Sequence, residues 1–342
     1  MMGFLIALGV LILVSIIWMV YRIQSLVSVV KGSDKKTATG SNKINAALFI
    51  LFLLGAGGLM FWYSIKEFDN YTLPIASEHG VVTDKLFWIT MAVTGVVFII
   101  THILLFWFSY AYQYKEDKRA SFYPDNNKLE IIWTLVPALV LTVLIVSGWK
   151  AWTDITAPAP ENAHVVEVMG YQFAWEFRYP GKDNQLGSYD YRLINPSNSR
   201  GVDFTDKNSL DDFPSQKIVI PKGEPVLFKI RSRDVLHSVF APHMRLKMDA
   251  VPGMPTRFWF VPTKTTAEMR AELQDEEFVY ELACTEVCGG GHFSMRREIE
   301  VVEPAEYQKW MAEQQTFIEM DPELIADAPA EIKELAQIQI GE

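Results

Sequence analysis

Four side chains that bind soft metal ions lie within twelve residues of one another. The segment reads Cys284-Thr-Glu-Val-Cys288-Gly-Gly-Gly-His292-Phe-Ser-Met295, and it holds both cysteines of the chain. Thiolate, thioether and imidazole groups together form a ligand set that suits copper. Three successive glycines allow the backbone to fold closely around an ion. We expect one further ligand, His237, from the end of a strand in the segment Asp234-Val-Leu-His237-Ser238.

The spacing of the two thiols is compatible with other uses as well. In an oxidising compartment they could form a disulfide, and in a structural zinc site they would supply two ligands. A mononuclear blue-copper site would need only one of them. Two cysteines are too few for a disulfide framework, and the chain has no C-x-x-C-H motif for covalent haem attachment. The whole string C-x-E-x-C-x3-H-x2-M favours a copper site that uses both thiols.

The first half of the chain predicts a membrane anchor. About 20 apolar residues are enough to cross a bilayer as a helix. The chain has four uncharged apolar runs of about this length or longer, namely Met1–Tyr21, Ile44–Ile65, Leu86–Tyr114 and Ile131–Trp149. The first run has no basic region before it and no small-residue cleavage pattern after it. We therefore predict a membrane span there and not a cleaved signal peptide.

The charges of the loops between these runs predict their orientation. The loops after the first and third runs are basic, with Arg22, Lys31, Lys35, Lys36 and Lys43 in one and Lys115, Lys118, Arg119 and Lys128 in the other. The loop after the second run holds more acidic than basic residues. Because basic loops stay in the cytoplasm, the N-terminus and the C-terminal half should both lie outside. We expect the inner membrane of a bacterium, with the C-terminal half in the periplasm.

The two halves of the chain differ in charge. Residues 1–151 include 12 basic and 9 acidic residues, whereas residues 152–342 include 19 and 32, a net charge of −13. Such an acidic half lacks the basic face that a nucleic-acid-binding protein needs. An aromatic content of 13% also excludes a disordered chain.

The second half predicts a β-sandwich or barrel, because short runs rich in β-branched and aromatic residues alternate with turn signals. The expected strands are His164–Met169, Gln172–Tyr179, Lys217–Ile220, Pro225–Ile230, Arg257–Pro262, Glu268–Leu273, Phe278–Ala283 and Glu298–Val302. The turn-rich stretch Gly181–Ser215 is expected to be a long excursion between strands. After Glu303 we expect a terminal helix and a solvated acidic tail.

These patterns divide the chain into five expected parts. They are a membrane hairpin at 1–65, a second hairpin at 86–151, a Pro/Ala-rich linker at 152–163, a β-domain at 164–305 and a helical tail at 306–342.

The motifs resemble the dinuclear copper centre, CuA, of subunit II of haem–copper cytochrome c oxidases. Besides the two copper motifs, similar segments are Leu129-Glu-Ile-Ile-Trp-Thr-Leu-Val-Pro-Ala138, Gly170-Tyr-Gln-Phe-Ala-Trp-Glu-Phe177 and Leu246-Lys-Met-Asp-Ala-Val-Pro-Gly253. The resemblance covers about residues 86–305 and implies a membrane-anchored, cupredoxin-like Greek-key β-sandwich. The family usually has two membrane spans, which match the third and fourth apolar runs, so the hairpin at 1–65 is additional.

When the family's ligand positions are carried over to this sequence, the resemblance implies five side-chain ligands for two copper ions. Cys284 and Cys288 would bridge both ions through their thiolates, while His237 and His292 would each bind one ion. Met295 would be a weak axial ligand.

Other positions carry over further roles. Glu286 would supply its backbone carbonyl as the second axial ligand, and its side chain would reach a magnesium ion shared with the catalytic subunit I. Asp249 would join the hydrogen-bond network at that boundary, and Glu130 would lie near the cytoplasmic mouth of a proton-uptake route. Phe173 stands where many family members have the tryptophan at which electrons enter, and Trp175 follows two residues later.

The resemblance implies the subunit of a respiratory cytochrome c oxidase at which electrons enter. A c-type cytochrome, either diffusing or fixed in a supercomplex, would reduce the copper pair. A haem in subunit I would receive the electron, and oxygen reduction and proton pumping would occur in that subunit. Subunit III and membrane lipid are the other expected partners.

Two alternative functions are compared with this interpretation. The copper domain of a nitrous oxide reductase would bring a propeller domain and a soluble chain, whereas this chain has four apolar runs. A quinol oxidase subunit or copper-free scaffold would lack the copper ligands, whereas all five ligand side chains are present.

Overall fold

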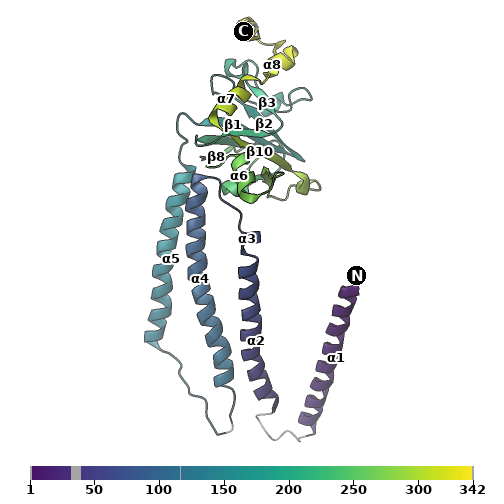
Figure 1. Ribbon diagram of the computed structural model, residues 1–342, viewed down its shortest axis with the longest axis vertical. Helices are drawn as coiled ribbons and strands as arrows, with labels where there is room; N and C mark the ends of the chain where they lie inside the picture. Colours follow the sequence, from purple (N-terminus) through teal and green to yellow (C-terminus); the bar gives the residue numbers. More distant parts are fainter. Residues whose placement is uncertain (1, 32–39, 116, 341–342) are drawn as a thin grey trace. The chain divides into compact units, whose positions relative to one another are not determined.

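The computed structural model of the chain describes residues 2–31, 40–115 and 117–340 (Figure 1). Within these ranges, four helices are long and apolar enough to cross a membrane, as predicted. They are α1 (Met2–Val30), α2 (Gly40–Lys66), α4 (Glu78–Ala111) and α5 (Asn127–Thr156), and a short helix α3 (Phe68–Tyr71) follows α2. Met1 of the first run and the last two residues of the tail lie outside the described residues.

The chain forms two compact units whose boundaries differ from the expected parts. One unit comprises Met1–Phe68 and Val93–Ile131, and the other comprises Asp69–Ala92 and Ile132–Glu342. The beginning of α4 and most of α5 therefore belong with the β-strands. Helix α5 continues through Thr156, so the irregular linker is confined to residues 157–163.

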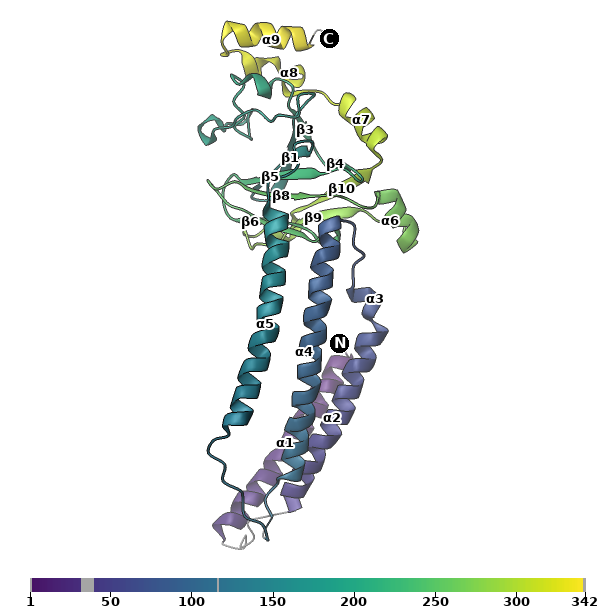
Figure 2. The same ribbon diagram turned by 90° about the vertical axis from the view of Figure 1, so that its left-hand side faces the viewer.

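The strands form a sandwich of two five-stranded sheets (Figure 2). The first sheet has the order β3-β2-β1-β5-β8, and the second has the order β4-β10-β9-β6-β7. The strands are β1 (His164–Tyr171), β2 (Ala174–Tyr179), β3 (Phe213–Ser215), β4 (Ile218–Pro221), β5 (Val226–Ser232), β6 (His237–Ala241), β7 (Leu246–Ala250), β8 (Thr256–Phe260), β9 (Tyr280–Cys284) and β10 (Arg296–Val302). Alternate residues such as Val166, Val168, Phe228 and Ile230 face the shared core and are fully buried. The sheets are antiparallel except for the pairs β1–β5 and β4–β10.

One predicted strand is wrong, and three strands were not predicted. Glu268–Leu273 belongs to a helix, α6 (Thr266–Leu273). The Thr265 hydroxyl accepts the Glu268 N–H, and the Glu268 carboxylate accepts the Thr265 N–H, which forms a capping box. That reciprocal cap and the helix-favouring residues after it outweigh the strand pattern. The strands missing from the list are β3, β6 and β7, and His237, which was expected at the end of a strand, is instead the first residue of β6.

The C-terminal stretch is helical, as expected, but it packs a few buried residues against the rest of the domain and is not a free tail. It forms α7 (Pro304–Ala312), α8 (Phe317–Met320), η5 (Pro322–Ile325) and α9 (Ala330–Ile340), as Figure 2 shows. A second apolar core joins it to the excursion before β3, with Val202, Phe204 and Leu210 from the excursion and Ile318, Ile325 and Ala336 from the C-terminal stretch. The excursion is thereby held between the first sheet and the end of the chain.

A buried ion cluster fixes the excursion to the outer face of the first sheet. Both carboxylate oxygens of Glu167 accept hydrogen bonds from Arg178 and from Arg231, at 2.9–3.0 Å. Arg178 also donates to Asp212 (2.8 Å) and to the carbonyl of Gly187 in the excursion (3.0 Å). Burial alone would raise the pKa of Glu167, but the two arginines hold it at about 2.

We predict that Glu167→Gln destabilises the external domain by about 3–5 kcal/mol at neutral pH, because it leaves two buried arginines without their shared carboxylate. The depressed pKa of Glu167 stabilises the wild type above pH 4.5, and that contribution is lost as the pH falls from about 4.5 to 2. Denaturant unfolding of the full chain, followed by near-UV circular dichroism between pH 7 and 3, measures both effects.

The matched control is Glu300→Gln, because the Lys217–Glu300 pair is more than 40% exposed on both sides. It should change stability by no more than about 1 kcal/mol. Equal stability of Glu167→Gln and wild type at pH 7 would contradict the assigned role.

A cluster of contacts ties the beginning of α4 to the turn between β6 and β7. Arg245 ends η3 (Pro242–Met244), and its guanidinium binds both carboxylate oxygens of Asp84, at 2.6 and 2.9 Å. The same guanidinium donates to the Leu73 carbonyl (2.7 Å). The Ser77 hydroxyl donates to the Met244 carbonyl (2.7 Å) and the Ala76 N–H to the His243 carbonyl (2.8 Å). We refer to these contacts of residues 73–84 with residues 243–245 as the clamp.

We predict that Asp84→Ala loosens the clamp, because it removes two charge-assisted hydrogen bonds worth about 1.5–3 kcal/mol each. Amide hydrogen exchange in residues 73–84 of the full chain should become at least about tenfold faster. Glu313→Ala, which removes an exposed pair with Lys309, is the control and should leave that exchange unchanged. Unchanged protection in Asp84→Ala would mean that the ion pair does not hold the segment.

Candidate metal centre

Two paired strands bring the first two predicted ligands together. His237 is the first residue of β6, and Cys284 is the last residue of β9. The strands are antiparallel, with Val239 opposite Cys284, so the two side chains meet at one end of the sheet. The distance from His237 Nδ1 to Cys284 Sγ is 3.8 Å.

The loop after β9 brings the remaining predicted ligands to the same place. Cys288 Sγ lies 3.6 Å from His292 Nδ1 and 3.4 Å from Met295 Sδ. Cys284 Sγ lies 3.3 Å from the backbone carbonyl of Glu286. The ligand atoms of His237, Cys284 and Cys288 all lie within 4.8 Å of one another. The residues expected to bind copper thus converge on one small volume.

Asp234 sets the orientation of the His237 ring. Asp234 Oδ1 lies 2.9 Å from His237 Nε2, and Asp234 Oδ2 accepts the backbone N–H of Gln172 at 2.7 Å. Burial would raise the pKa of Asp234, but these hydrogen bonds lower it overall, so the carboxylate is an acceptor. Nε2 therefore carries the proton, and Nδ1, which faces Cys284, keeps its lone pair for a metal. Sequence reasoning assigned no role to Asp234, although its position three residues before His237 was a usable signal.

Side chains from the turn between β1 and β2, and from β2 itself, hold the ligand loop from the side of the first sheet. Gln172 Nε2 donates to the Cys288 carbonyl (2.6 Å), and Trp175 Nε1 donates to the Met295 carbonyl (3.3 Å). The ring of Phe173 lies against Gly289 and Gly291, and a Cβ on Gly291 would be 2.5 Å from Phe173 Cγ. Only glycine fits under this ring. Nothing in the sequence indicated the contribution of Gln172, because it depends on contacts between sheets.

The chemistry of the donors fits a copper site. Both cysteines are free and buried, so they do not form the disulfide bond considered as an alternative. Burial and the adjacent Cys284 raise the pKa of the Cys288 thiol to about 11. Two adjacent thiolates therefore need a bound cation, and metal binding would displace their protons. Two sulfurs that each lie beside an imidazole, with a thioether and a carbonyl near them, would suit copper better than a hard cation.

The other predicted site residues lie in different surroundings. Phe173 is 39% exposed, whereas Trp175 is 2% exposed, so only the phenylalanine reaches the surface substantially. Asp249 lies on β7 opposite Ser238, and both Asp249 and Glu286 are exposed. Glu130 lies in the first turn of α5, in the other compact unit, and is not part of the ligand cluster.

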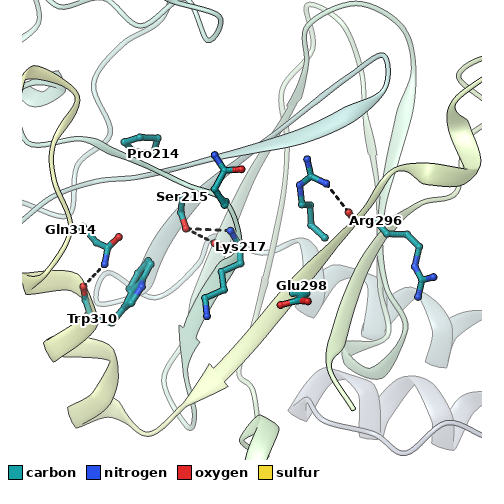
Figure 3. A pocket seen from close by; sticks show the side chains of 9 residues that line it. Pro214, Ser215, Lys217, Arg296, Glu298, Trp310 and Gln314 are labelled. Atoms are coloured by element: carbon teal, nitrogen blue, oxygen red, sulfur yellow. Dashed lines mark hydrogen bonds between the residues drawn. The ribbon is translucent and has the colours of Figure 1, made fainter. Parts of the chain in front are cut away.

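A groove of 660 Å³ lies beside the ligand loop. Two of its lining residues, Arg296 and Arg297, directly follow the ligand Met295 in the sequence. Figure 3 shows Glu298 between Lys217 and Arg296, with Trp310 and Gln314 on the other side of Lys217. Lys217 forms an ion pair with Glu300, and Arg296 forms one with Glu281. These cations are neutralised within the domain, and the groove adds no sulfur or imidazole ligand.

The fold and the ligand cluster together define a membrane-anchored β-sandwich protein with a copper-type site. Comparisons with known families place it further. Residues 164–302 match the family described as "Cytochrome C oxidase subunit II, periplasmic domain", and residues 61–150 match "Cytochrome C oxidase subunit II, transmembrane domain". The chain belongs to the cytochrome c oxidase subunit II family.

Two relatives agree with this assignment, and one solved structure is similar over part of the chain. The chain is similar to the "Alternative cytochrome c oxidase subunit 2" of Bradyrhizobium diazoefficiens, with 33% identity over 281 residues that cover 80% of this chain and 93% of the relative. It is 32% identical to the "Probable cytochrome c oxidase subunit 2" of Rickettsia prowazekii over 190 residues, 56% of this chain and 54% of that protein. Among solved structures, the periplasmic domain of subunit II of cytochrome oxidase of Bradyrhizobium japonicum is 24% identical and covers 45% of this chain and 94% of its own, with a TM-score of 0.30.

Several expectations are thereby confirmed. The family resemblance holds, and so does the fold class of membrane helices followed by a cupredoxin-like sandwich. The chain is a membrane-anchored subunit of a haem–copper oxidase, an oxidoreductase complex, and its β-domain is periplasmic.

We predict that Gly291→Ala impairs metal loading, because its Cβ would displace Phe173 or the ligand loop. Overpacking of this kind costs about 1–3 kcal/mol. Copper bound per chain, measured in competition with a chelator, should decrease, and the second substitution Phe173→Ala should restore it.

Gly290→Ala is the matched control, because a Cβ there meets no atom within 4 Å. It should load copper as the wild type does. Equal loading of Gly291→Ala and wild type would show that the Phe173 ring does not constrain the loop.

Proposed function

We propose that this chain is the subunit of a respiratory cytochrome c oxidase at which electrons enter. It accepts electrons from a c-type cytochrome and passes them to a haem in subunit I, where oxygen is reduced and protons are pumped. The observation that carries the proposal is the pair of buried thiols, Cys284 and Cys288, each beside an imidazole Nδ1 at 3.6–3.8 Å.

The arrangement supports a definite set of residues for holding the two copper ions. The thiolates of Cys284 and Cys288 would be shared by the ions, and Nδ1 of His237 and of His292 would each bind one. Met295 and the carbonyl of Glu286 would supply the weaker ligands. Such a pair, when bound, shares one electron over two metals, so that the ligand geometry changes little on reduction.

The protein's own contribution is to keep this geometry fixed and dry. His237 and Met295 are 0% and 1% exposed and both cysteines are buried, so water has little access to these four side chains. Asp234 prevents the His237 ring from turning, and Trp175 and Gln172 hold the loop from the opposite sheet. A rigid site lowers the reorganisation that each electron transfer requires.

The surfaces around the site support the assignment of partners. Phe173 lies over the ligand loop and is partly exposed, which suits the place where electrons enter. The net charge of −13 in residues 152–342 favours encounter with a basic cytochrome. The exposed carboxylates of Glu286 and Asp249 are available to subunit I, with Glu286 as a magnesium ligand at that boundary.

The remaining assignments complete the proposal. Glu130, in the first turn of α5, belongs to the cytoplasmic mouth of a proton-uptake route of subunit I. Residues 86–151 form the hairpin usual in the family, residues 164–305 the copper domain, and residues 1–65 an additional hairpin. The complex includes subunit III and resides in a bacterial inner membrane.

We predict about two copper ions per purified chain and a mixed-valence absorption spectrum. Cys288→Ser should remove the bridge, abolish that spectrum and reduce cytochrome c oxidation by the assembled oxidase at least about a hundredfold. Metal analysis, electron paramagnetic resonance and oxygen consumption measure these outcomes.

Thr285→Ser is the control, because Thr285 is exposed and contacts Ser238 only through its backbone N–H. It should leave all three measurements unchanged. One zinc per chain, or wild-type oxidation of cytochrome c by Cys288→Ser, would refute the proposal.

A further inference from the structure

The outer face of the first sheet carries cations that the domain does not neutralise. The strand register aligns Arg178, Glu167, Lys229 and Arg257 side by side across β2, β1, β5 and β8. Glu167 is the only acid in this row, and both its oxygens are occupied by Arg178 and Arg231. Lys229 and Arg257 are exposed, and neither forms an ion pair with any residue that the structure describes. Like charges directly opposite on neighbouring strands are destabilising.

A pocket of 360 Å³ lies at this pair of cations. Its lining includes Tyr189, Lys229, Arg231 and Arg257, and we call it the cationic pocket. Arg231 is 5% exposed, and its guanidinium lies 4.2 Å from the centre of the Tyr189 ring. Nε and Nη2 of Arg231 donate to Glu167 and to the Arg200 carbonyl. Nη1 makes no hydrogen bond within the described part of the chain, so a positioned donor remains available.

The charge balance of the cationic pocket indicates an anionic ligand. Its lining holds three cations and one carboxylate, Glu167, which Arg178 also shares. This local excess of positive charge lies within residues 152–342, whose net charge is −13. Guanidinium groups bind planar or tetrahedral oxyanions through two donors, and a lysine ammonium adds a mobile point charge. The volume is at the small end of the range for small-molecule sites, which suits a phosphate group and not a large cofactor.

We propose that the cationic pocket binds a multivalent oxyanion of the phosphate class. Lys229 and Arg257 close over the anion from β5 and β8, and the fixed guanidinium of Arg231 orients it. Inorganic phosphate and the phosphate headgroup of an anionic lipid offer the same chemistry. The proposal is independent of the proposed copper function, because no lining residue is a copper ligand.

The test uses the full chain in a neutral detergent at low ionic strength. Calorimetric titration with inorganic phosphate should show saturable binding of one anion per chain. The double variant Lys229→Gln/Arg257→Gln should bind at least about tenfold more weakly. Both side chains are exposed, so folding should be unaffected, and an unchanged thermal unfolding profile checks this.

The control removes two cations elsewhere on the same domain, Lys264→Gln/Lys309→Gln, whose partners are Glu272 and Glu313. It should bind phosphate as the wild type does, which separates a specific site from net charge. The second arm replaces phosphate with short-chain phosphatidic acid. A lipid ligand would bind at least about tenfold more tightly than phosphate and lose this gain in the double variant, whereas a free anion would show no such gain.

Two results would overturn the proposal. One is the absence of saturable binding of either probe to the wild type at concentrations up to about 20 mM. The other is equal binding to the wild type and to Lys229→Gln/Arg257→Gln.

Discussion

The metal centre depends on strand β6 being held at both ends. Its first residue is the ligand His237, fixed by Asp234, and the turn after its last residue enters the clamp through Arg245 and Asp84. Five extended residues span about 17 Å, and both neighbouring strands, β7 and β9, pair with β6. A short, paired strand cannot stretch or bend much. The position of the ligands relative to the beginning of α4 is therefore set by covalent geometry and a few hydrogen bonds.

The sequence was most informative where local spacing carries the chemistry. The ligand string from Cys284 to Met295 needs only a tight loop, so its convergence could be predicted, and the four apolar runs follow from composition alone. Strand β6 was missed because a histidine and a serine open it, although His237 and Ser238 are buried. Glu268–Leu273 was predicted as a strand from its short alternation of apolar residues. It forms a helix because Thr265 and Glu268 cap the helix start with reciprocal hydrogen bonds.

The parts that could not be predicted depend on contacts between distant segments. Gln172 and Phe173 reach the ligand loop more than a hundred residues away in sequence. The acidic C-terminal stretch has the composition of a solvated tail, yet Ile318 and Ala336 are fully buried against the excursion. In both cases a residue packs against, or hydrogen-bonds to, a residue of a distant element. The pattern of residues within one segment gives no information about such a contact.

The packing of the chain's end onto residues 202–210 has a consequence for biosynthesis. The excursion emerges more than a hundred residues before α8 and α9, and the apolar side chains of Val202, Phe204 and Leu210 stay exposed until those helices arrive. The layer over Glu167 and Arg178 is thus completed only once α8 and α9 have been synthesised, while the strands beneath it can pair earlier. A chain truncated before α8 would keep every metal ligand. It would nevertheless expose the apolar side chains of residues 202–210 to proteases and chaperones in the compartment where it folds.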